Sequence, residues 1–236
     1  MNNIEYEVVG VTRDLSSVSK SVEEADYIEF QLDKAEDSLQ QLSEYDGRLP
    51  LIVSNRPEWA GGSASESNRL EKLLAAAASE SVKMVEIDLE TVRNEEWIVE
   101  ELRENHVDVI VAYYDFEKTP KKSDLQELIL DCDEYGDISK VSVFANERED
   151  ALLLLECLNE ASQRGMRVTG VSLGELGQHT RAIGVFYGVE LCYAPIELDG
   201  ESKYGEMELD QLVELLETTV HGGDHVELID QLKGKF

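Results

Sequence analysis

The sequence predicts a single-domain α/β fold, a (β/α)₈ TIM barrel, on two observations. Eight short runs rich in β-branched residues alternate with amphipathic helical patterns along the whole chain. The chain has 236 residues, close to the usual length of one such barrel. We expect the barrel over residues 1–220 and a tail or short helix over residues 221–236. A doubly wound open sheet is the alternative, but no Gly-x-Gly-x-x-Gly motif follows the first strand and no P-loop occurs.

The expected strands are short apolar runs, as is typical of parallel strands covered on both faces. They are Tyr6–Thr12, Tyr27–Leu32, Leu51–Asn55, Met84–Leu89, Val109–Tyr114, Val141–Ala145, Val168–Leu173 and Leu191–Ala194.

Between the strands, apolar residues recur at helical spacing. The clearest helical patterns are Ser67–Ser79, Ser123–Asp133 and Glu147–Gln163. In the last of these, apolar residues over 151–158 repeat at i, i+3, i+4 and i+7, which predicts one buried helix face. Asn146-Glu147, and Ser123 with Gln126 three residues later, are the expected helix caps.

The composition is strongly acidic, with 51 Asp and Glu against 21 Lys and Arg and a formal net charge of −30. Such a charge repels phosphate backbones, so nucleic acid is not an expected partner. The acidic residues are dispersed, which indicates adaptation to a salt-rich cytoplasm where salt screens their repulsion. No apolar run is long enough to cross a membrane, and no signal-peptide pattern is present. We therefore expect a halophilic, cytoplasmic protein without a membrane partner.

The three cysteines, Cys132, Cys157 and Cys192, are an odd number without metal-ligand spacing. We expect free buried thiols, two in helices and one in a strand, and neither a disulfide framework nor a metal site.

Catalytic side chains of a barrel lie where strands end and the βα loops begin. Residues at those positions are Arg56, Tyr113–Asp115, Asn146, Glu175–Arg181 and the loop Glu197–Glu206. Lys140 directly precedes the apolar run Val141–Phe144. Desolvation in such a place lowers a lysine pKa and provides a neutral amine that can attack a ketone. A lysine that reaches out to solvent from the strand entrance is the alternative.

Five groups of residues occur in a characteristic order and spacing. They are Tyr27–Asp33, Ser54-Asn55-Arg56 followed by Gly61-Gly62, Tyr114-Asp115-Phe116 with Thr119-Pro120, Ser139-Lys140-Val141, and His179-Thr180-Arg181. Together they resemble type I 3-dehydroquinate dehydratase over nearly the whole chain. The stretch Gly177–Pro195 resembles the haloarchaeal branch in particular, in agreement with the acidic composition.

This resemblance implies a barrel, usually a homodimer, that dehydrates 3-dehydroquinate to 3-dehydroshikimate in the shikimate pathway of aromatic amino-acid biosynthesis. It implies no metal and no cofactor, and a small carboxylated substrate as the partner. In the family a lysine forms a Schiff base with the substrate ketone. A histidine removes the adjacent proton and then helps water leave, while arginines hold the carboxylate. A protonated imine draws electrons from the neighbouring carbon, so one base can serve both steps.

By this resemblance, Lys140 matches the Schiff-base lysine, Arg56 the strand-three arginine, and Arg181 the arginine after strand seven. Glu29 matches the acidic residue of the strand-two Glu-x-Arg pair, and Ser202 lies where the final loop supplies a serine to the substrate. Bidentate hydrogen bonding suits arginine to a carboxylate ligand.

Four positions depart from the family pattern, all within the expected site. Tyr114 stands in place of the general-base histidine, and Ala60 in place of a glutamate before the Gly-Gly pair. Gln31 replaces the arginine of the strand-two pair, and Glu206 replaces a last-loop glutamine. Gln31 and Glu206 stay among the expected substrate-binding residues, with weakened recognition or an altered ligand preference. Loss of a general base typically costs ~10²–10⁴-fold in rate.

Two residues are candidates for the missing proton transfers. Tyr114 is a weaker base if a nearby ammonium lowers its phenol pKa, and His179 lies two residues before Arg181. Three functions stay open at this point. The first is a working dehydratase with an altered proton relay, and the second is a barrel with other Schiff-base chemistry, such as retro-aldol cleavage. The third is a diverged paralogue that has lost dehydratase activity and binds a carboxylated metabolite or a protein.

Overall fold

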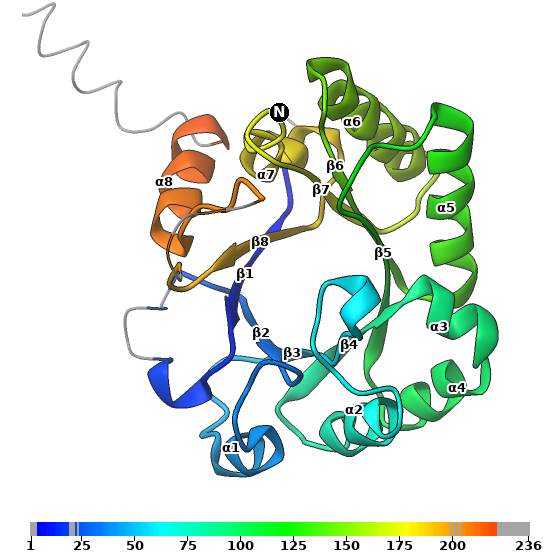
Figure 1. Ribbon diagram of the computed structural model, residues 1–236. Helices are drawn as coiled ribbons and strands as arrows, with labels where there is room; N and C mark the ends of the chain where they lie inside the picture. The colour runs from blue at the N-terminus through cyan, green and yellow to red at the C-terminus, as the bar shows by residue number, and fades with distance from the viewer. Residues whose placement is uncertain are drawn as a thin grey trace, which may run out of the picture.

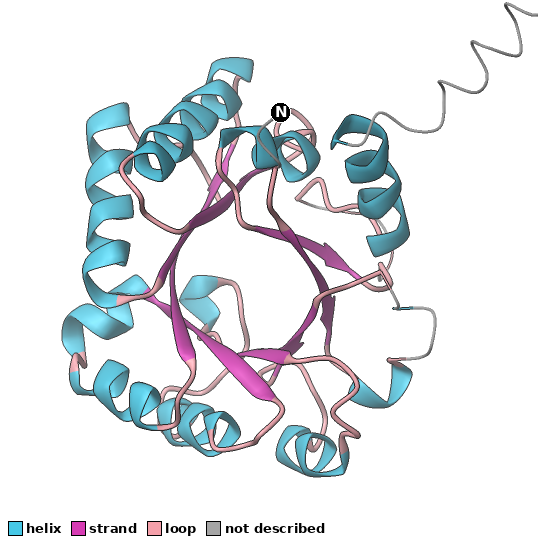
Figure 2. Cartoon of the chain, turned by 180° about the vertical axis from the view of Figure 1, so that it is seen from behind, coloured by secondary structure: helices cyan, strands magenta, loops and turns pink. Residues whose placement is uncertain are grey.

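The computed structural model describes residues 4–18, 22, 24–198, 200, 202 and 204–220, and these form the predicted (β/α)₈ barrel (Figure 1). All eight described strands are parallel and follow the order β7-β6-β5-β4-β3-β2-β1-β8. A bridge between Val168 and Val189 joins the two ends of this order, so the barrel is nearly closed. Figure 2 shows the ring of strands from behind, with the helices outside it. The open sheet considered from the sequence is therefore excluded, and the predicted tail 221–236 lies outside the described residues.

The strands lie where the sequence predicts them, with shifted ends. They are β1 Glu7–Thr12, β2 Tyr27–Gln31, β3 Leu51–Ser54, β4 Val82–Asp88, β5 Asp108–Asp115, β6 Ile138–Phe144, β7 Val168–Leu173 and β8 Leu191–Pro195. The largest shift concerns β6, which begins at Ile138 instead of Val141 because Ile138 and Ser139 already pair with β5. Lys140 consequently lies within the strand, and the prediction that it precedes the strand is wrong.

Helices follow the strands and cover the outside of the barrel. They are α1 Ser38–Glu44, α2 Arg69–Ala77, α3 Leu89–Asn94, α4 Trp97–Glu104, α5 Lys122–Tyr135, α6 Arg148–Gln163, α7 Thr180–Ile183 and α8 Leu209–Val220, with 3₁₀ turns η1 Leu15–Ser17, η3 Glu58–Ala60 and η4 Gly184–Tyr187. The predicted cap of α6 is confirmed, since Glu147 is its N-cap and forms a capping box with Asp150. The predicted cap of α5 is wrong. Lys121 is the N-cap of α5, and the Ser123 hydroxyl instead donates to Asp124.

The three cysteines are buried and free, in α5, α6 and β8 as predicted, and burial raises the pKa of the Cys192 thiol to about 12. No helix among the described residues is long and apolar enough to cross a membrane.

The interior of the barrel is filled by a separate apolar layer. It consists of Val9, Ile52, Met84, Ile110, Ile138 and Leu191, with Tyr27 and Tyr193 packed against it. Strand side chains repeat on the same face every second residue, so the residues two positions later also point inward. Those residues include Val11, Glu29, Ser54, Glu86, Ala112, Lys140 and Tyr193. The apolar layer thus lies next to a polar layer, and the polar layer is at the C-terminal ends of the strands, where barrels carry their active sites.

Candidate active site

Lys140 is the centre of this polar layer. It is only 6% exposed, so the alternative of a solvent-directed lysine is wrong. Its Nζ donates a hydrogen bond of 2.6 Å to Glu86 Oε2 and lies 3.6 Å from Glu29 Oε2. The ammonium also sits 3.5 Å from the centroid of the Tyr193 ring. Ala112 of β5 lies between β4 and β6, and its small side chain leaves room for the contact between Lys140 and Glu86.

Arg56 pairs with the same two carboxylates through their other oxygens: it contacts Oε1 of Glu86 and of Glu29, whereas Lys140 faces Oε2 of each. Its Nε donates to Glu86 Oε1 at 2.6 Å and its Nη2 to Glu29 Oε1 at 2.5 Å. The Ser54 hydroxyl adds a third donor, 2.9 Å from Glu29 Oε1. Burial acts to raise the pKa of Glu86, but Arg56 and Lys140 outweigh it and hold that pKa well below its ordinary value. The cluster therefore contains one buried cation, one partly buried cation and two buried carboxylates in direct contact.

The loop after β3 fixes Arg56 through close backbone packing. The Arg56 amide donates to Asp33 Oδ1, and its carbonyl accepts from Ala64. A Cβ on Gly62 would lie 2.0 Å from the Arg56 carbonyl oxygen, a distance that no side chain tolerates. Gly62 of the sequence motif thus has a steric reason, which is the close approach of the loop to the end of the strand.

Tyr114 contacts the same cluster as a hydrogen-bond donor. Its hydroxyl donates to Glu86 Oε1 at 2.6 Å, and its ring is stacked on Phe116 with centroids 5.7 Å apart. Burial raises the pKa of Tyr114 well above 10, Arg56 opposes the rise, and Glu86 adds to it. The expectation that a neighbouring cation lowers this pKa is therefore wrong, because desolvation and the carboxylate dominate. At neutral pH the side chain is a protonated phenol.

A second group of predicted residues meets in the loop between β8 and α8. The Arg181 guanidinium donates to the carbonyls of Tyr193, Tyr204 and Gly205 at 3.0–3.4 Å. Burial lowers the pKa of Arg181, and Glu206 partly offsets this. Glu206 Oε2 accepts from the Ser202 hydroxyl at 2.7 Å and from the Tyr204 amide at 3.0 Å. Ser202 and Glu206 thus pair with each other, and Arg181 lies beside them.

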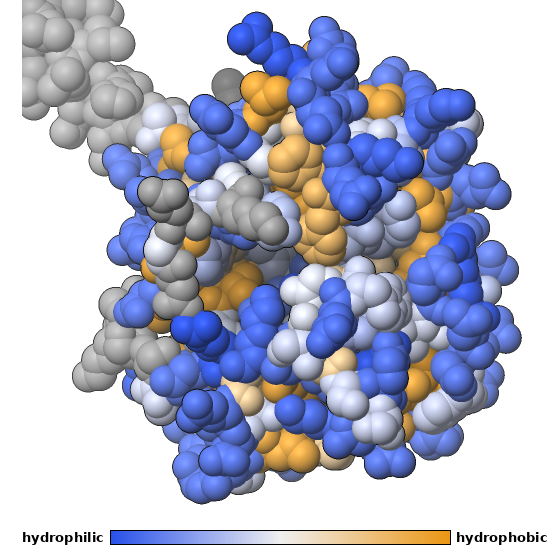
Figure 3. All heavy atoms as spheres, in the orientation of Figure 1, coloured by the Kyte–Doolittle hydropathy of each residue, from blue (hydrophilic) through white to orange (hydrophobic). Residues whose placement is uncertain are grey.

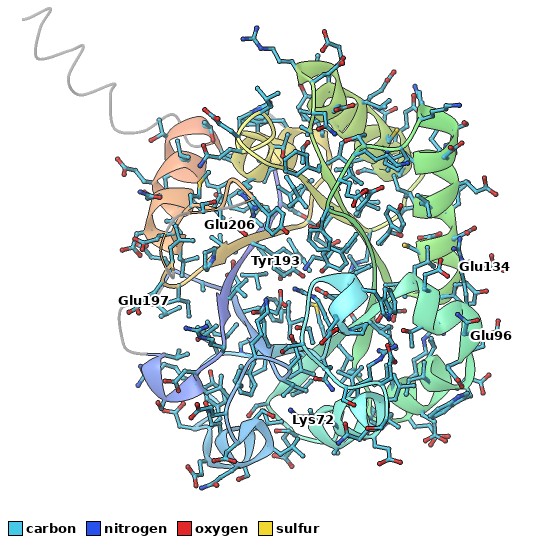
Figure 4. All side chains as sticks on the ribbon, in the orientation of Figure 1. Lys72, Glu96, Glu134, Tyr193, Glu197 and Glu206 are labelled. Atoms are coloured by element: carbon cyan, nitrogen blue, oxygen red, sulfur yellow. The ribbon has the colours of Figure 1, made fainter. Side chains whose placement is uncertain are left out.

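Tyr193 connects the two groups. Its backbone carbonyl accepts from Arg181, and its ring packs on the Lys140 ammonium. Figure 4 labels Tyr193 inside the ring of strands and Glu206 on the segment above β8. The Tyr193 hydroxyl is buried without a hydrogen-bond partner among the described residues, so a ligand hydroxyl or carbonyl could pair with it.

The remaining predicted residues lie around this centre. Gln31 ends β2 on the same face as Glu29, beside Ser54 across the ladder, and is partly exposed. Ala60 is buried in η3. His179 is the N-cap residue of α7 and is exposed, whereas Lys140 is buried inside the barrel.

Two residues of the site, Glu86 and Tyr193, are not among those predicted from the sequence. Glu86 lies inside the buried run of β4, between Val85 and Ile87, whereas Lys140 was singled out because it precedes an apolar run. Tyr193 carries no signal of either kind, because an aromatic residue in a strand is ordinary.

The arrangement suits a small anionic carbonyl compound. The buried amine can form an imine, the arginines can bind a carboxylate, and Glu86 and Glu29 can exchange protons. Figure 3 shows the face seen in Figure 1 as largely hydrophilic, with a hollow near its centre.

Comparison with known proteins relates the chain to one family of enzymes. The family model for type I 3-dehydroquinase matches residues 9–222. A 3-dehydroquinate dehydratase of Haloquadratum walsbyi is 36% identical over 228 residues, covering 92% of this chain and 93% of its own. One from Halobacterium salinarum is 34% identical over 197 residues, covering 81% of this chain and 87% of its own. The crystal structure of 3-dehydroquinate dehydratase from Geobacillus kaustophilus has a TM-score of 0.81 at 21% identity and covers 93% of each chain.

Proposed function

Because the chain belongs to the type I 3-dehydroquinase family, we propose that it dehydrates 3-dehydroquinate to 3-dehydroshikimate through a Schiff base on Lys140. The observation that carries the proposal is the buried Lys140 amine at the C-terminal end of the barrel, in contact with Glu86 and enclosed by Tyr193. The curated relatives bear the dehydratase name, so the comparisons give no support to a lost activity or to other Schiff-base chemistry.

The substrate is a β-hydroxy ketone with a carboxylate, and the site offers a group for each part. The Lys140 amine adds to the ketone, and the resulting iminium acidifies the adjacent carbon. Arg181, with Arg56, binds the carboxylate and ring oxygens. Glu29, Gln31, Ser202 and Glu206 surround the remaining hydroxyls. Tyr114, at the position of the family histidine, serves as a phenol donor rather than as the base, since its pKa is raised.

Borohydride trapping with 3-dehydroquinate tests the covalent step. We expect one adduct on Lys140, with the mass of the dehydrated product, because turnover passes through the product iminium as well as the substrate iminium. Intact mass gives the number of adducts and a peptide map gives the modified residue. The absence of any adduct, together with no release of 3-dehydroshikimate, would contradict the proposed function. The acidic surface and haloarchaeal relatives make molar salt the appropriate condition.

Arg181→Met is expected to raise KM by ~10–150-fold with a smaller change in kcat. The reason is that a hydrogen bond to a charged group contributes about 1.5–3 kcal/mol, and Arg181 is distant from the reacting bonds. Steady-state kinetics separates the two parameters. Arg167→Met is the matched control, since Arg167 pairs with Glu190 and Asp108 before β7 begins. Equal KM values for the two variants would remove Arg181 from the substrate site.

The homodimer stays a prediction from the resemblance, and the cytoplasmic location stays a prediction from the sequence. They are compatible with the proposed activity, and the proposal does not depend on them.

A further inference from the structure

We propose that Glu86 is the proton carrier of this reaction: its carboxylate takes the proton from the carbon beside the imine and returns it to the departing hydroxyl. This inference rests on the proposed function and deepens it, because it assigns the step that the family histidine would otherwise perform.

The position of Glu86 relative to Lys140 carries the argument. Glu86 Oε2 lies 2.6 Å from Lys140 Nζ, the atom that becomes the imine nitrogen. The carbon to be deprotonated is separated from that nitrogen by two bonds, roughly 2.5 Å. A carboxylate oxygen in contact with the nitrogen is therefore within reach of a proton on that carbon, which is the first requirement of a general base.

The other candidates fit this role less well. Tyr114 is a protonated phenol that donates to Glu86, so it orients the carboxylate. Because it already carries its proton, it cannot accept another as a general base. Glu29 lies farther from Lys140, at 3.6 Å, and its nearer oxygen contacts go to Arg56 and Ser54. His179 is exposed on α7. Among the described residues that touch Lys140, Glu86 makes the shortest contact.

Arg56 explains how a strongly ion-paired carboxylate becomes an effective base. Arg56 Nε is hydrogen-bonded to Glu86 Oε1. A substrate oxygen that binds Arg56 competes for the same guanidinium and weakens this ion pair. Glu86 then loses part of its cationic stabilisation and its affinity for a proton rises. Substrate binding and activation of the base are thereby coupled through one side chain.

The proton balance of the elimination closes with Glu86. To form the imine, the Lys140 ammonium gives a proton to water, the free amine adds to the ketone, and a proton from water is returned as the carbinolamine hydroxyl leaves as water. Glu86 next removes the proton from the carbon beside the iminium, and the C–H electrons form an enamine. The enamine then expels the hydroxyl as the C–O bond breaks, and the Glu86 acid protonates it to water. Hydrolysis of the product iminium consumes the first water and regenerates Lys140.

Three variants, Glu86→Gln, Glu29→Gln and Tyr114→Phe, test the assignment when compared by kcat and by borohydride trapping. We expect Glu86→Gln to lower kcat by ~10²–10⁴-fold and to trap the undehydrated substrate on Lys140, since the imine forms but its neighbouring proton stays. Glu29→Gln removes the neighbouring buried carboxylate on the same arginine. It is expected to weaken substrate binding but should still trap the dehydrated product, because Glu86 keeps the proton transfer. Tyr114→Phe loses one hydrogen bond to the charged Glu86 carboxylate and should cost ~10–150-fold.

Each remaining outcome has a distinct meaning. A Glu86→Gln variant that traps the dehydrated product at the wild-type rate would overturn the assignment. A Glu86→Gln variant that forms no adduct would also overturn it, because Glu86 would then be required for imine formation instead of for removal of the carbon-bound proton. A larger loss in Tyr114→Phe than in Glu86→Gln would return the base role to the phenol. If the unaltered chain itself neither forms an adduct nor releases product, the proposed function fails, and the assignment of Glu86 fails with it.

Discussion

Lys140→Met is expected to abolish the dehydration of 3-dehydroquinate, with a loss in kcat of more than about 10³-fold. Removal of a general base alone costs ~10²–10⁴-fold, and removal of the lysine closes the iminium route on which that base acts. Loss of one of the two cations lowers the stability, but the barrel should stay folded, because Glu86 keeps Arg56 and Tyr114 as hydrogen-bond partners and Glu29 keeps Arg56 and Ser54. Methionine also has nearly the length of the lost side chain, so it leaves little empty volume.

Steady-state rates and borohydride trapping measure this effect. Lys122→Met is the control, because Lys122 is a partly exposed lysine of α5 paired with Glu156 and Glu160 and should keep both the rate and the adduct. Lys140→Arg retains the cation without the nucleophile and should be as inactive as Lys140→Met. Residual turnover in Lys140→Arg near the wild-type rate would show that the reaction proceeds without a Schiff base and would refute the covalent mechanism.

The fold could be predicted because barrel strands and helices have strong local signals. Continuous apolar runs of strand length, separated by periodic helical segments, leave few arrangements other than a ring of parallel strands. Strand ends were less predictable, as β6 shows. Ser139 and Lys140 are polar, yet they continue the ladder with β5 because backbone pairing does not depend on side-chain polarity.

The site was predicted less completely, for reasons that its contacts make clear. Lys140, Arg56 and Glu29 come together as a cluster, but their shared partner Glu86 comes from a strand with no marked motif. The direction in which the cluster shifts the Tyr114 pKa depends on where each charge lies relative to the phenol. An arginine and a carboxylate both touch the phenol, and burial decides the direction of the pKa shift. Spacing along the chain carries none of this information.

Arg56→Met is expected to destabilise the folded barrel by about 3–5 kcal/mol, because it leaves two buried carboxylates with one cation. Arg56 is 15% exposed, and the Glu29 and Glu86 side chains are each 1% exposed. For a chain of this size the loss corresponds to a decrease in Tm of roughly 6–20 °C. Urea unfolding and thermal unfolding at fixed salt measure it. Arg48→Met is the control, since Arg48 is 44% exposed and lies 4.0 Å from Asp46, and should change the stability by less than about 0.5 kcal/mol.

The pH dependence of this difference identifies its electrostatic origin. In the unaltered protein Arg56 and Lys140 hold the pKa of Glu86 below its unfolded value of about 4.3, although burial acts in the opposite direction. Stability gained from ionised Glu86 is therefore fully present above about pH 5 and is lost as the pH falls toward the folded pKa. Without Arg56 the pKa of Glu86 in the folded protein rises, so the variant loses less unfolding free energy when the pH is lowered. The gap in unfolding free energy should accordingly be largest above about pH 5 and shrink as the pH decreases. A gap that is independent of pH would instead attribute the role of Arg56 to packing of its side chain.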